Sequence, residues 1–204
     1  MAISVVLFNG SPRKGGNTET CLRRVQRGLE SAGIRSEIVP IADKKIEPCR
    51  ACYACEGQRR CAQEDDLNDM IARMEAADGI IIGSPTWFGS VTGWVKNLID
   101  RAGFVSRMNG HMYRGKVGAP VIALRRGGAV QVYNEIISFF AINHFYMVGS
   151  SYWNFAFGLE PGEAAHDAEG MRTMDDLAAN MAHLLKALEA AGAPGAPCLP
   201  PRSP

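Results

Sequence analysis

The sequence predicts an α/β protein in which helices cover both faces of a five-stranded parallel sheet. Short and mostly apolar runs, each suited to one strand, occur at residues 3–8, 36–42, 79–83, 117–124 and 145–150. Helical patterns separate these runs, and such alternation is typical of a parallel sheet in a three-layer sandwich. Three of the runs end in glycine-containing loops, which we expect to meet at the carboxyl edge of the sheet.

The first half of the chain carries signals for strand ends and sheet order. The run at 3–8 is apolar almost throughout, as in a strand covered on both faces. A helix is expected from Asn17, a residue suited to cap it, up to Gly33, which can end it. Pro40 lies in the strand at 36–42 and cannot donate a hydrogen bond to a neighbouring strand. It therefore favours an edge position for this strand, and the order 2-1-3-4-5 follows.

The remaining helices are predicted from caps and apolar periodicity. Asp65 and Asp66 are expected to cap the second helix, whose apolar residues are spaced three and four apart. These helices are predicted at 67–74, 91–100, 133–140 and 171–188.

Length and composition predict one domain. The chain has 204 residues, which suits a single domain from 1 to 191 with a cysteine-rich insertion at 49–61. Residues 192–204 are mainly Ala, Gly and Pro, and we expect a flexible tail because such a segment buries little apolar surface.

Charge and hydropathy exclude some classes of function. The formal net charge is +1 and 21% of the residues are charged, which argues against nucleic-acid binding and membrane attraction. No apolar stretch approaches the ~18 residues of a membrane helix. The run at 3–8 is too short for a signal peptide, so a cytoplasmic protein is expected.

The first loop, N-G-S-P-R-K-G-G-N-T at 9–18, has the features of an anion site. A loop between a buried strand and a helix offers backbone N–H groups and a partial positive charge. Ser11, Asn17 and Thr18 can donate hydrogen bonds, and Arg13 can contact a phosphate with two N–H groups. The pattern is neither a P-loop nor the dinucleotide fingerprint. No carboxylate in the loop can bind Mg²⁺, so a phosphate site without metal is predicted.

The other two loops suggest a flat ring beside that phosphate. S-P-T-W-F-G-S at 84–90 contains Trp87 and Phe88, and R-R-G-G follows at 125–128. Micromolar binding requires about 8 kcal/mol, which a phosphate together with a stacked ring can supply. Two alternatives stay open: a glycine-rich connection with solvated cations, and a core-packing role for the two aromatic residues.

In combination, the loops resemble those of the flavodoxin-like NADPH-dependent FMN reductase superfamily. The motifs are G-S-P-R-K-G-G-N-T, G-S-P-T-W-F-G-S-V-T-G-W-V-K-N-L-I-D-R and R-R-G-G-A, within about residues 3 to 188. The resemblance implies FMN with its phosphate on Ser11, Arg13, Asn17 and Thr18. It implies an isoalloxazine ring against Pro85, Thr86, Trp87, Phe88 and Gly89, with Arg126, Gly127 and Gly128 beside the pyrimidine edge. A cation or backbone donor at that edge would stabilise reduced flavin.

The segment P-C-R-A-C-Y-A-C-E-G-Q-R-R-C at 48–61 has the spacing C-x₂-C-x₂-C-x₅-C. Three cysteines in tandem argue against zinc and are typical of a [4Fe–4S] site. The spacing resembles the iron-sulfur flavoproteins, a branch of the same superfamily. By that resemblance the ligands are Cys49, Cys52, Cys55 and Cys61. Because plain flavin reductases carry similar segments, a loop without a cluster stays open.

These patterns favour an FMN-dependent oxidoreductase in which the flavin performs the chemistry and no side chain need act as acid or base. The first hypothesis is NAD(P)H-dependent reduction of flavin, quinone or a similar small acceptor. The alternative is an electron carrier that uses a [4Fe–4S] cluster and FMN and docks with a redox protein. The cysteine segment is expected on the far side of the first strand from the ring. We therefore expect a homodimer or homotetramer, in which electrons can cross between subunits.

Overall fold

The computed structural model describes residues 2–192. Its strands are β1 (Ser4–Asn9), β2 (Arg35–Pro40), β3 (Gly79–Pro85), β4 (Val117–Leu124), β5 (Tyr146–Met147) and β6 (Phe155–Phe157). Its helices are α1 (Asn17–Ser31), α2 (Leu67–Ala76), α3 (Gly93–Met108), α4 (Ala129–Ile142), the short 3₁₀ helix η1 (Glu163–His166) and α5 (Ala168–Ala190). The predicted tail, apart from Gly192, lies outside the described residues.

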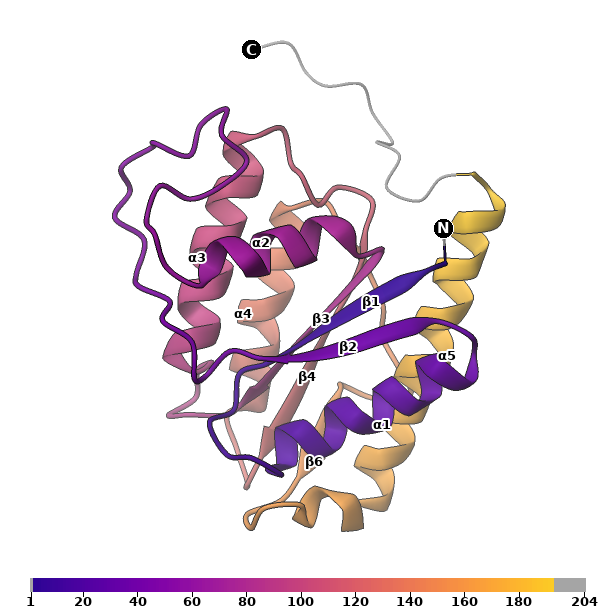
Figure 1. The fold of residues 1–204 in the computed structure, drawn as a ribbon. Coiled ribbons are helices and arrows are strands. Elements are labelled where there is room, and N and C mark those ends of the chain that lie inside the picture. The colour runs from indigo at the N-terminus through magenta and orange to yellow at the C-terminus, as the bar shows by residue number, and fades with distance from the viewer. Residues whose placement is uncertain (1, 193–204) are drawn as a thin grey trace.

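The sheet has the predicted parallel order β2-β1-β3-β4-β5, and β6 adds a further pairing to β4 (Figure 1). Pro40 ends β2, which pairs with β1 at one edge of the sheet, as expected. No helix of the described residues is both long and apolar enough to cross a membrane.

The fifth strand position differs from the prediction of one strand at 145–150. It is divided between β5, beside the start of β4, and β6, beside its end. Between them, the Asn154 side chain donates to the carbonyl oxygen of Pro120 at 2.9 Å, and the Asn154 carbonyl accepts from Ile122 N–H at 2.9 Å. Pro120 has no N–H group to continue a regular ladder. The chain therefore leaves the sheet and returns as β6.

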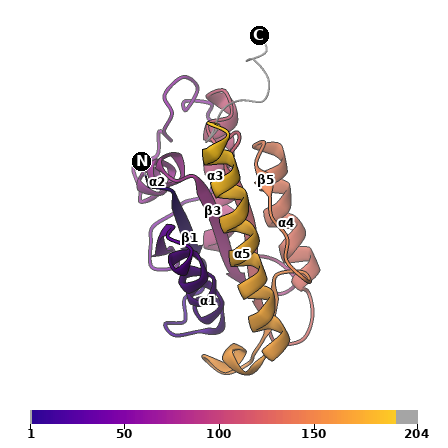
Figure 2. The same ribbon diagram turned by 90° about the vertical axis from the view of Figure 1, so that its right-hand side faces the viewer.

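Helices cover both faces of the sheet, which Figure 2 shows from the side of α5. Along β1, Val6 and Phe8 belong to the core shared with α2, α3 and α4, and Val5 and Leu7 to the core shared with α1 and α5. Successive side chains of a strand point to opposite faces. Two cores thus explain why β1 shows no alternation of polar and apolar residues.

Helix α1 begins differently from the prediction. Gly16, not Asn17, is the N-cap, and no side chain caps this end. Asn17 is the first helical residue, and its Oδ1 accepts a hydrogen bond from Ala164 N–H at 3.0 Å. Gly33 follows the helix with φ of +80°, which agrees with its predicted role in ending the helix.

Close packing on β4 leads to a prediction for stability. A Cβ added to Gly118 would lie 2.6 Å from the Phe140 ring, whereas one added to Gly149 would meet nothing within 4 Å. We expect Gly118→Ala to lower the free energy of unfolding by about 1–3 kcal/mol through overpacking. The control Gly149→Ala should change it by less than about 0.5 kcal/mol. Urea denaturation followed by circular dichroism measures both, and equal effects would contradict this account.

Candidate functional site

A cavity of about 340 Å³ lies at the carboxyl edge of the sheet, where the loops after β1, β3, β4 and β6 meet. Its lining residues are Ser11, Pro12, Arg13, Asn17, Thr18, Pro85, Thr86, Trp87, Ala123, Leu124, Arg125, Gly158 and Leu159. The structure therefore brings the four residues predicted to bind phosphate together with three of the residues predicted to contact the ring.

The loops after β1 and β3 are fixed to each other beneath this cavity. Gly10 N–H donates to the Gly83 carbonyl oxygen at 2.9 Å, and the Thr92 hydroxyl donates to the Gly10 carbonyl oxygen at 3.0 Å. A Cβ on Gly10 would lie 2.2 Å from Cγ2 of Val95. Only glycine fits at this crossing, which brings the first loop against the start of α3.

The N-terminus of α1 leaves hydrogen-bond donors for an anion. Thr20 N–H makes the first intrahelical bond, to the Gly16 carbonyl oxygen, so the amides before it have no partner within the helix. The hydroxyl of Thr18 is buried and has no hydrogen-bond partner among the described residues. Buried polar groups are normally paired. The unpaired hydroxyl beside free amides therefore fits a bound phosphate.

A fourth loop, at residues 158–162, completes this end of the cavity. Nη1 of Arg13 donates to the Leu159 carbonyl oxygen at 3.4 Å. A Cβ on Gly158 would lie 2.6 Å from Nδ2 of Asn17, so glycine is needed there. Backbone N–H groups of Glu160 and Leu159 bond to the carboxylate of Glu163 and hold its pKa below the usual value.

Sequence reasoning missed this loop because it placed the fifth strand too early. The signal was present as G-L-E-P-G at 158–162, which directly follows β6. A strand at 145–150 ends eight residues before this stretch, so the predicted strand order does not mark it as a strand-end loop.

The loop after β3 forms a small hairpin beside the cavity. Trp87 and Ser90 exchange two backbone hydrogen bonds of 3.0 Å, and Phe88 and Gly89 make the turn with φ of +49° and +75°. Trp87 lines the cavity, whereas the Phe88 side chain is fully exposed at the tip.

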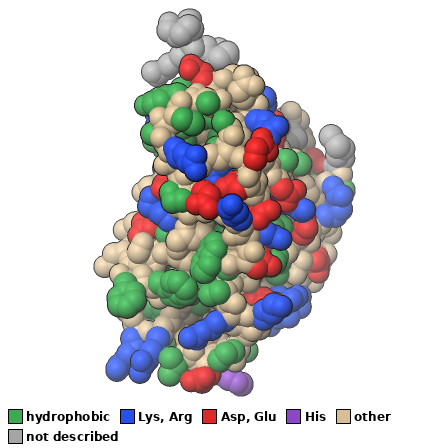
Figure 3. All heavy atoms as spheres, turned by 60° about the vertical axis from the view of Figure 1, so that its left-hand side comes forward, with side chains coloured by type: hydrophobic (Ala, Val, Ile, Leu, Met, Phe, Trp, Pro, Cys, Tyr) green, Lys and Arg blue, Asp and Glu red, His purple; other side chains and the backbone are tan. Residues whose placement is uncertain are grey.

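Figure 3 shows hydrophobic side chains gathered in the lower half of one face, near Lys and Arg side chains. The hydroxyl of Thr86, like that of Thr18, is buried without a partner.

The R-R-G-G loop separates its two arginines. Arg125 lines the cavity described above, but Arg126, Gly127 and Gly128 line a neighbouring cavity. Gly128 has φ of +87°, and a Cβ on it would lie 3.0 Å from the Cα of Gly89. The loop therefore packs directly on the hairpin after β3.

The four clustered cysteines line a third and small cavity next to α3, together with Arg101 and Phe104. Burial is the main reason that the pKa of the Cys55 thiol lies above its usual value, and repulsion from the other three thiolates adds to the shift. All cysteines in the described part of the chain are free thiols. No group of three or more His, Cys, Asp or Glu within residues 2–192 is arranged as a metal centre. The structure thus gathers the thiols of Cys49 and Cys52 with those of Cys55 and Cys61 without forming coordination geometry.

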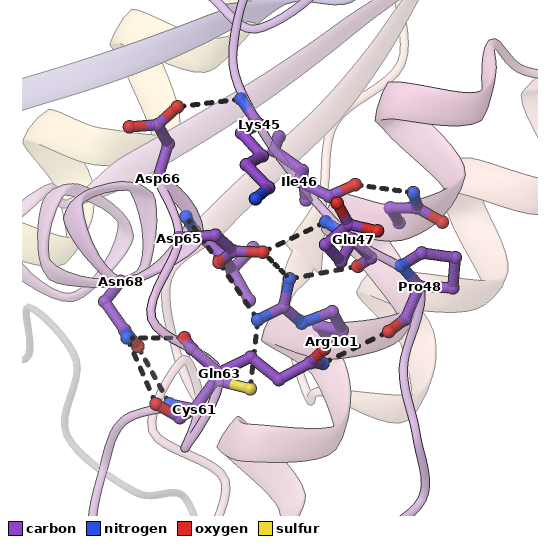
Figure 4. A network of polar contacts seen from close by, with 12 residues as sticks. Lys45, Ile46, Glu47, Pro48, Cys61, Gln63, Asp65, Asp66, Asn68 and Arg101 are labelled. Atoms are coloured by element: carbon purple, nitrogen blue, oxygen red, sulfur yellow. Dashed lines mark hydrogen bonds and ion pairs between the residues drawn. The ribbon is translucent and has the colours of Figure 1, made fainter.

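A buried ion pair attaches the cysteine segment to α3 (Figure 4). The side chains of Arg101 and Asp65 are 0% and 2% exposed and form a two-pronged salt bridge. Arg101 also donates to the Glu47 carbonyl oxygen at 2.9 Å and to the Cys61 sulfur at 3.1 Å. One guanidinium therefore holds the chain both before and after the cysteine segment.

The Asp65-Asp66 pair, predicted to cap the second helix, does so only through Asp65, whose Oδ1 accepts from Leu67 N–H at the start of α2 at 3.3 Å. Asp66 occupies the N-cap position of α2 but makes no capping bond, and its carboxylate accepts from Lys45 N–H at 2.7 Å. Burial alone would raise the pKa of Asp65. Hydrogen bonds from Arg101 and from the amides of Glu47 and Leu67 nevertheless hold that pKa below its usual value.

Comparisons with known proteins show the family and the fold of this chain. Residues 3–160 match the family of NADPH-dependent FMN reductases. An iron-sulfur flavoprotein of Methanocaldococcus jannaschii is 33% identical over 92% of this chain and 100% of that protein. One of Methanosarcina thermophila is 31% identical over 89% of this chain and 95% of that protein. The solved structure of RosB with a bound intermediate has a TM-score of 0.75 at 18% identity, over 96% of this chain and 83% of that one, which supports the fold.

The buried ion pair leads to a prediction on stability and pH. Arg101→Met leaves Asp65 buried without its partner, which should lower the free energy of unfolding at pH 7 by about 3–5 kcal/mol. Because the folded-state pKa of Asp65 is depressed, its contribution is complete above about pH 4 and is lost as the pH falls through the folded-state value. Urea denaturation of the wild type and of Arg101→Met should therefore give free energies of unfolding that differ less at acid pH than at pH 7.

Lys96→Met provides the control on the same helix. Lys96 pairs with Asp100 at the surface, where both side chains are about half exposed. Removing this pair should cost no more than about 0.5 kcal/mol. If Arg101→Met and Lys96→Met lowered the free energy of unfolding equally at pH 7, the buried ion pair would not stabilise the fold more than a surface pair does.

Proposed function

The chain belongs to the NADPH-dependent FMN reductase family, and from this premise we propose that the cavity at the carboxyl edge of the sheet binds FMN. It is accordingly a flavin-dependent oxidoreductase. We propose that NAD(P)H is the electron donor and that a flavin, a quinone or a similar small molecule is the acceptor. The observation that supports the cavity assignment best is the buried and unpaired hydroxyl of Thr18 at the open N-terminus of α1.

At the phosphate end, the ligands in this proposal are the side chains of Ser11, Arg13, Asn17 and Thr18 with the first amides of α1. A charge-assisted hydrogen bond contributes roughly 1.5–3 kcal/mol, so three or four provide several kcal/mol. Arg13 also donates to Leu159 in the 158–162 loop, and Asn17 accepts from Ala164 in η1, which directly follows that loop. A bound phosphate would therefore join the loops after β1 and β6.

At the ring end, the isoalloxazine would pack on Pro85 and Trp87, with the Thr86 hydroxyl free to bond its polar edge. Phe88 and Gly89 would shape this wall as the tip of the hairpin rather than touch the ring. The amides of Gly127 and Gly128 remain our proposed donors beside the pyrimidine edge. Because Arg125 lines this cavity and Arg126 lines its neighbour, we assign the cation at that edge to Arg125.

Bound FMN supplies the hydride and electron transfer itself. The residues of this chain would fix its position and place positive charge near its pyrimidine edge. The proposal requires no side chain as acid or base.

A second candidate function is that of an iron-sulfur electron carrier. All four clustered cysteines line one cavity. Within their segment, Ala51, Tyr53 and Arg59 have φ between +48° and +58°, a conformation that non-glycine residues seldom adopt. Such strain is found mostly where function requires a particular backbone shape. We propose that the segment holds a [4Fe–4S] cluster on Cys49, Cys52, Cys55 and Cys61, and that a redox protein exchanges electrons with it.

Exposed aromatic side chains near both sites support an oligomer. The cysteine segment, the loop at the upper left of Figure 1, packs beside α3 near Arg101, eight residues beyond Gly93 at the helix start. At 1.5 Å per residue this is about 12 Å along the helix, away from the edge that holds the FMN cavity. The exposed side chains of Phe88 and Tyr53 lie near the two sites and could be covered by a second subunit. We propose a homodimer or homotetramer, located in the cytoplasm, where the free thiols would stay reduced.

The test of the proposed function begins with anaerobic purification and analysis of flavin, iron and sulfide. We expect one FMN per chain and reduction of that FMN by NADPH or NADH under anaerobic conditions. A flavin-loaded protein that neither nucleotide reduces would exclude the reductase function.

For the cluster, we expect about four iron atoms per chain, and Cys55→Ser should lose them while keeping FMN. Cys21→Ser is the control, because Cys21 is buried in α1 away from the segment. The cluster proposal fails if the anaerobic protein contains FMN but no iron.

The unpaired hydroxyl leads to a sharper prediction for FMN. Thr18→Val should leave the stability of the flavin-free protein unchanged or slightly raised, since it removes a buried and unpaired group. FMN affinity, measured by quenching of flavin fluorescence, should fall about 10- to 100-fold, the value of one charge-assisted hydrogen bond. In the control Thr20→Val, the lost hydroxyl donates only to the Gly16 carbonyl oxygen, and affinity should be kept. Equal FMN affinity in Thr18→Val and the wild type would refute the phosphate assignment.

A further inference from the structure

A second cavity, of about 260 Å³, lies next to the proposed FMN site. The R-R-G-G loop and the end of β6 separate the two, since Arg126 and Phe157 line the second cavity while Arg125 and Gly158 line the first. The start of α5 closes its other side. Of the residues that line this space, the FMN assignment uses only Gly127 and Gly128, through their amides.

One wall of the second cavity is a row of aromatic side chains. The rings of Trp153 and Phe155 stack with centroids 6.0 Å apart and an angle of 27°, and Tyr152 meets Trp153 edge to face at 4.8 Å. Trp153 is 48% exposed and Phe157 is 51% exposed. Large aromatic rings that are both ordered by their neighbours and open to a cavity form a stacking platform for a flat ligand.

Two opposite charges face the same cavity without pairing. Arg126 lines it from the R-R-G-G loop, and Glu169 lines it from the first turn of α5. Neither side chain makes a hydrogen bond or ion pair within residues 2–192. The Asp167 carboxylate, by contrast, already has hydrogen-bond partners, because it accepts from Gly170 N–H at 2.9 Å and from Phe157 N–H at 2.8 Å. It fixes the shape of the cavity and leaves Arg126 and Glu169 as the charges available to a ligand.

The ligand that matches this arrangement has a flat ring, a hydrogen-bond donor on the edge of that ring and an anionic group. An adenosine phosphate has all three. We propose, on the basis of the reductase function proposed above, that the second cavity binds the adenosine phosphate half of the nicotinamide dinucleotide. Adenine would stack on Trp153 with its amino group toward Glu169, and a phosphate would bind Arg126.

The size and position of the cavity support this choice. Small-molecule sites commonly measure about 300–1,000 Å³, so a cavity slightly below that range suits half of a dinucleotide rather than the whole. Gly127 and Gly128, which line it, belong to the loop that packs on the hairpin beside the FMN cavity. The nicotinamide half would cross this loop to reach the flavin.

The test uses the FMN-loaded protein with adenosine 2′,5′-bisphosphate as the probe. In isothermal titration calorimetry, Arg126→Gln and Trp153→Ala should each weaken probe binding about 10-fold or more. In steady-state assays both should raise KM for NADPH by a similar factor and leave kcat unchanged, because the residues bind the donor away from the reacting ring. FMN content should stay the same. The control is Arg172→Gln, an exposed arginine of α5 that does not line the cavity, and it should match the wild type.

Each remaining result overturns a stated part of the proposal. If NADPH reduces the flavin but neither variant changes KM or probe binding, the second cavity is not the adenosine site and the reductase function stands. If neither nicotinamide nucleotide reduces the flavin, the reductase function fails and the dinucleotide assignment fails with it. If the wild type binds FAD more tightly than FMN and Arg126→Gln removes that difference, the cavity holds the adenosine of the flavin cofactor instead.

Discussion

The contact between the ends of β1 and β3 is the constraint on which the candidate site depends. Gly10 bonds to Gly83 in the neighbouring strand and to Thr92 at the start of α3, and the space at its Cα excludes any side chain. This crossing determines where the first loop leaves the sheet, and hence where the N-terminus of α1 points. The direction of the unpaired donors of that helix is therefore a consequence of packing beneath them.

Helix α3 connects both candidate sites. Thr92 at its start holds the loop after β1, and Arg101, about two turns further on, holds the cysteine segment through Asp65 and Cys61. Removing either partner of a buried ion pair is costly because it leaves an unpaired charge inside the protein. One helix thus fixes the loop after β1 and the cysteine segment relative to each other within one chain.

Much of the fold was predictable from the sequence, and the exceptions share a cause. Strands such as β1 and β3, which are buried along almost their whole length, are mostly apolar, so the sequence identifies them directly. The division of the fifth strand depends on Pro120 in the neighbouring strand and on Asn154, a pairing that no local pattern indicates. That error in turn concealed the loop at 158–162, because a strand-end loop is recognised by the strand before it.

The residue types of the candidate site were predictable from the sequence. Which of these residues line the first cavity and which line its neighbour was less predictable. The N-terminus of a helix after a glycine-rich loop indicates an anion site from sequence alone, and Thr18 and Trp87 do line one cavity. The separation of Arg125 from Arg126 depends on the conformation of a four-residue loop. Arg101 resembles a surface residue of an amphipathic helix until its partner 36 positions earlier is known.

The glycine at the N-cap of α1 affects how the stability of the folded protein depends on its ligand. Because Gly16 provides no side chain to satisfy the first turn, a bound anion would complete the helix in place of a capping residue. A ligand that binds only the folded state stabilises it in proportion to the logarithm of its concentration. If the proposed FMN is that anion, the unfolding temperature of the protein would rise with the concentration of free FMN.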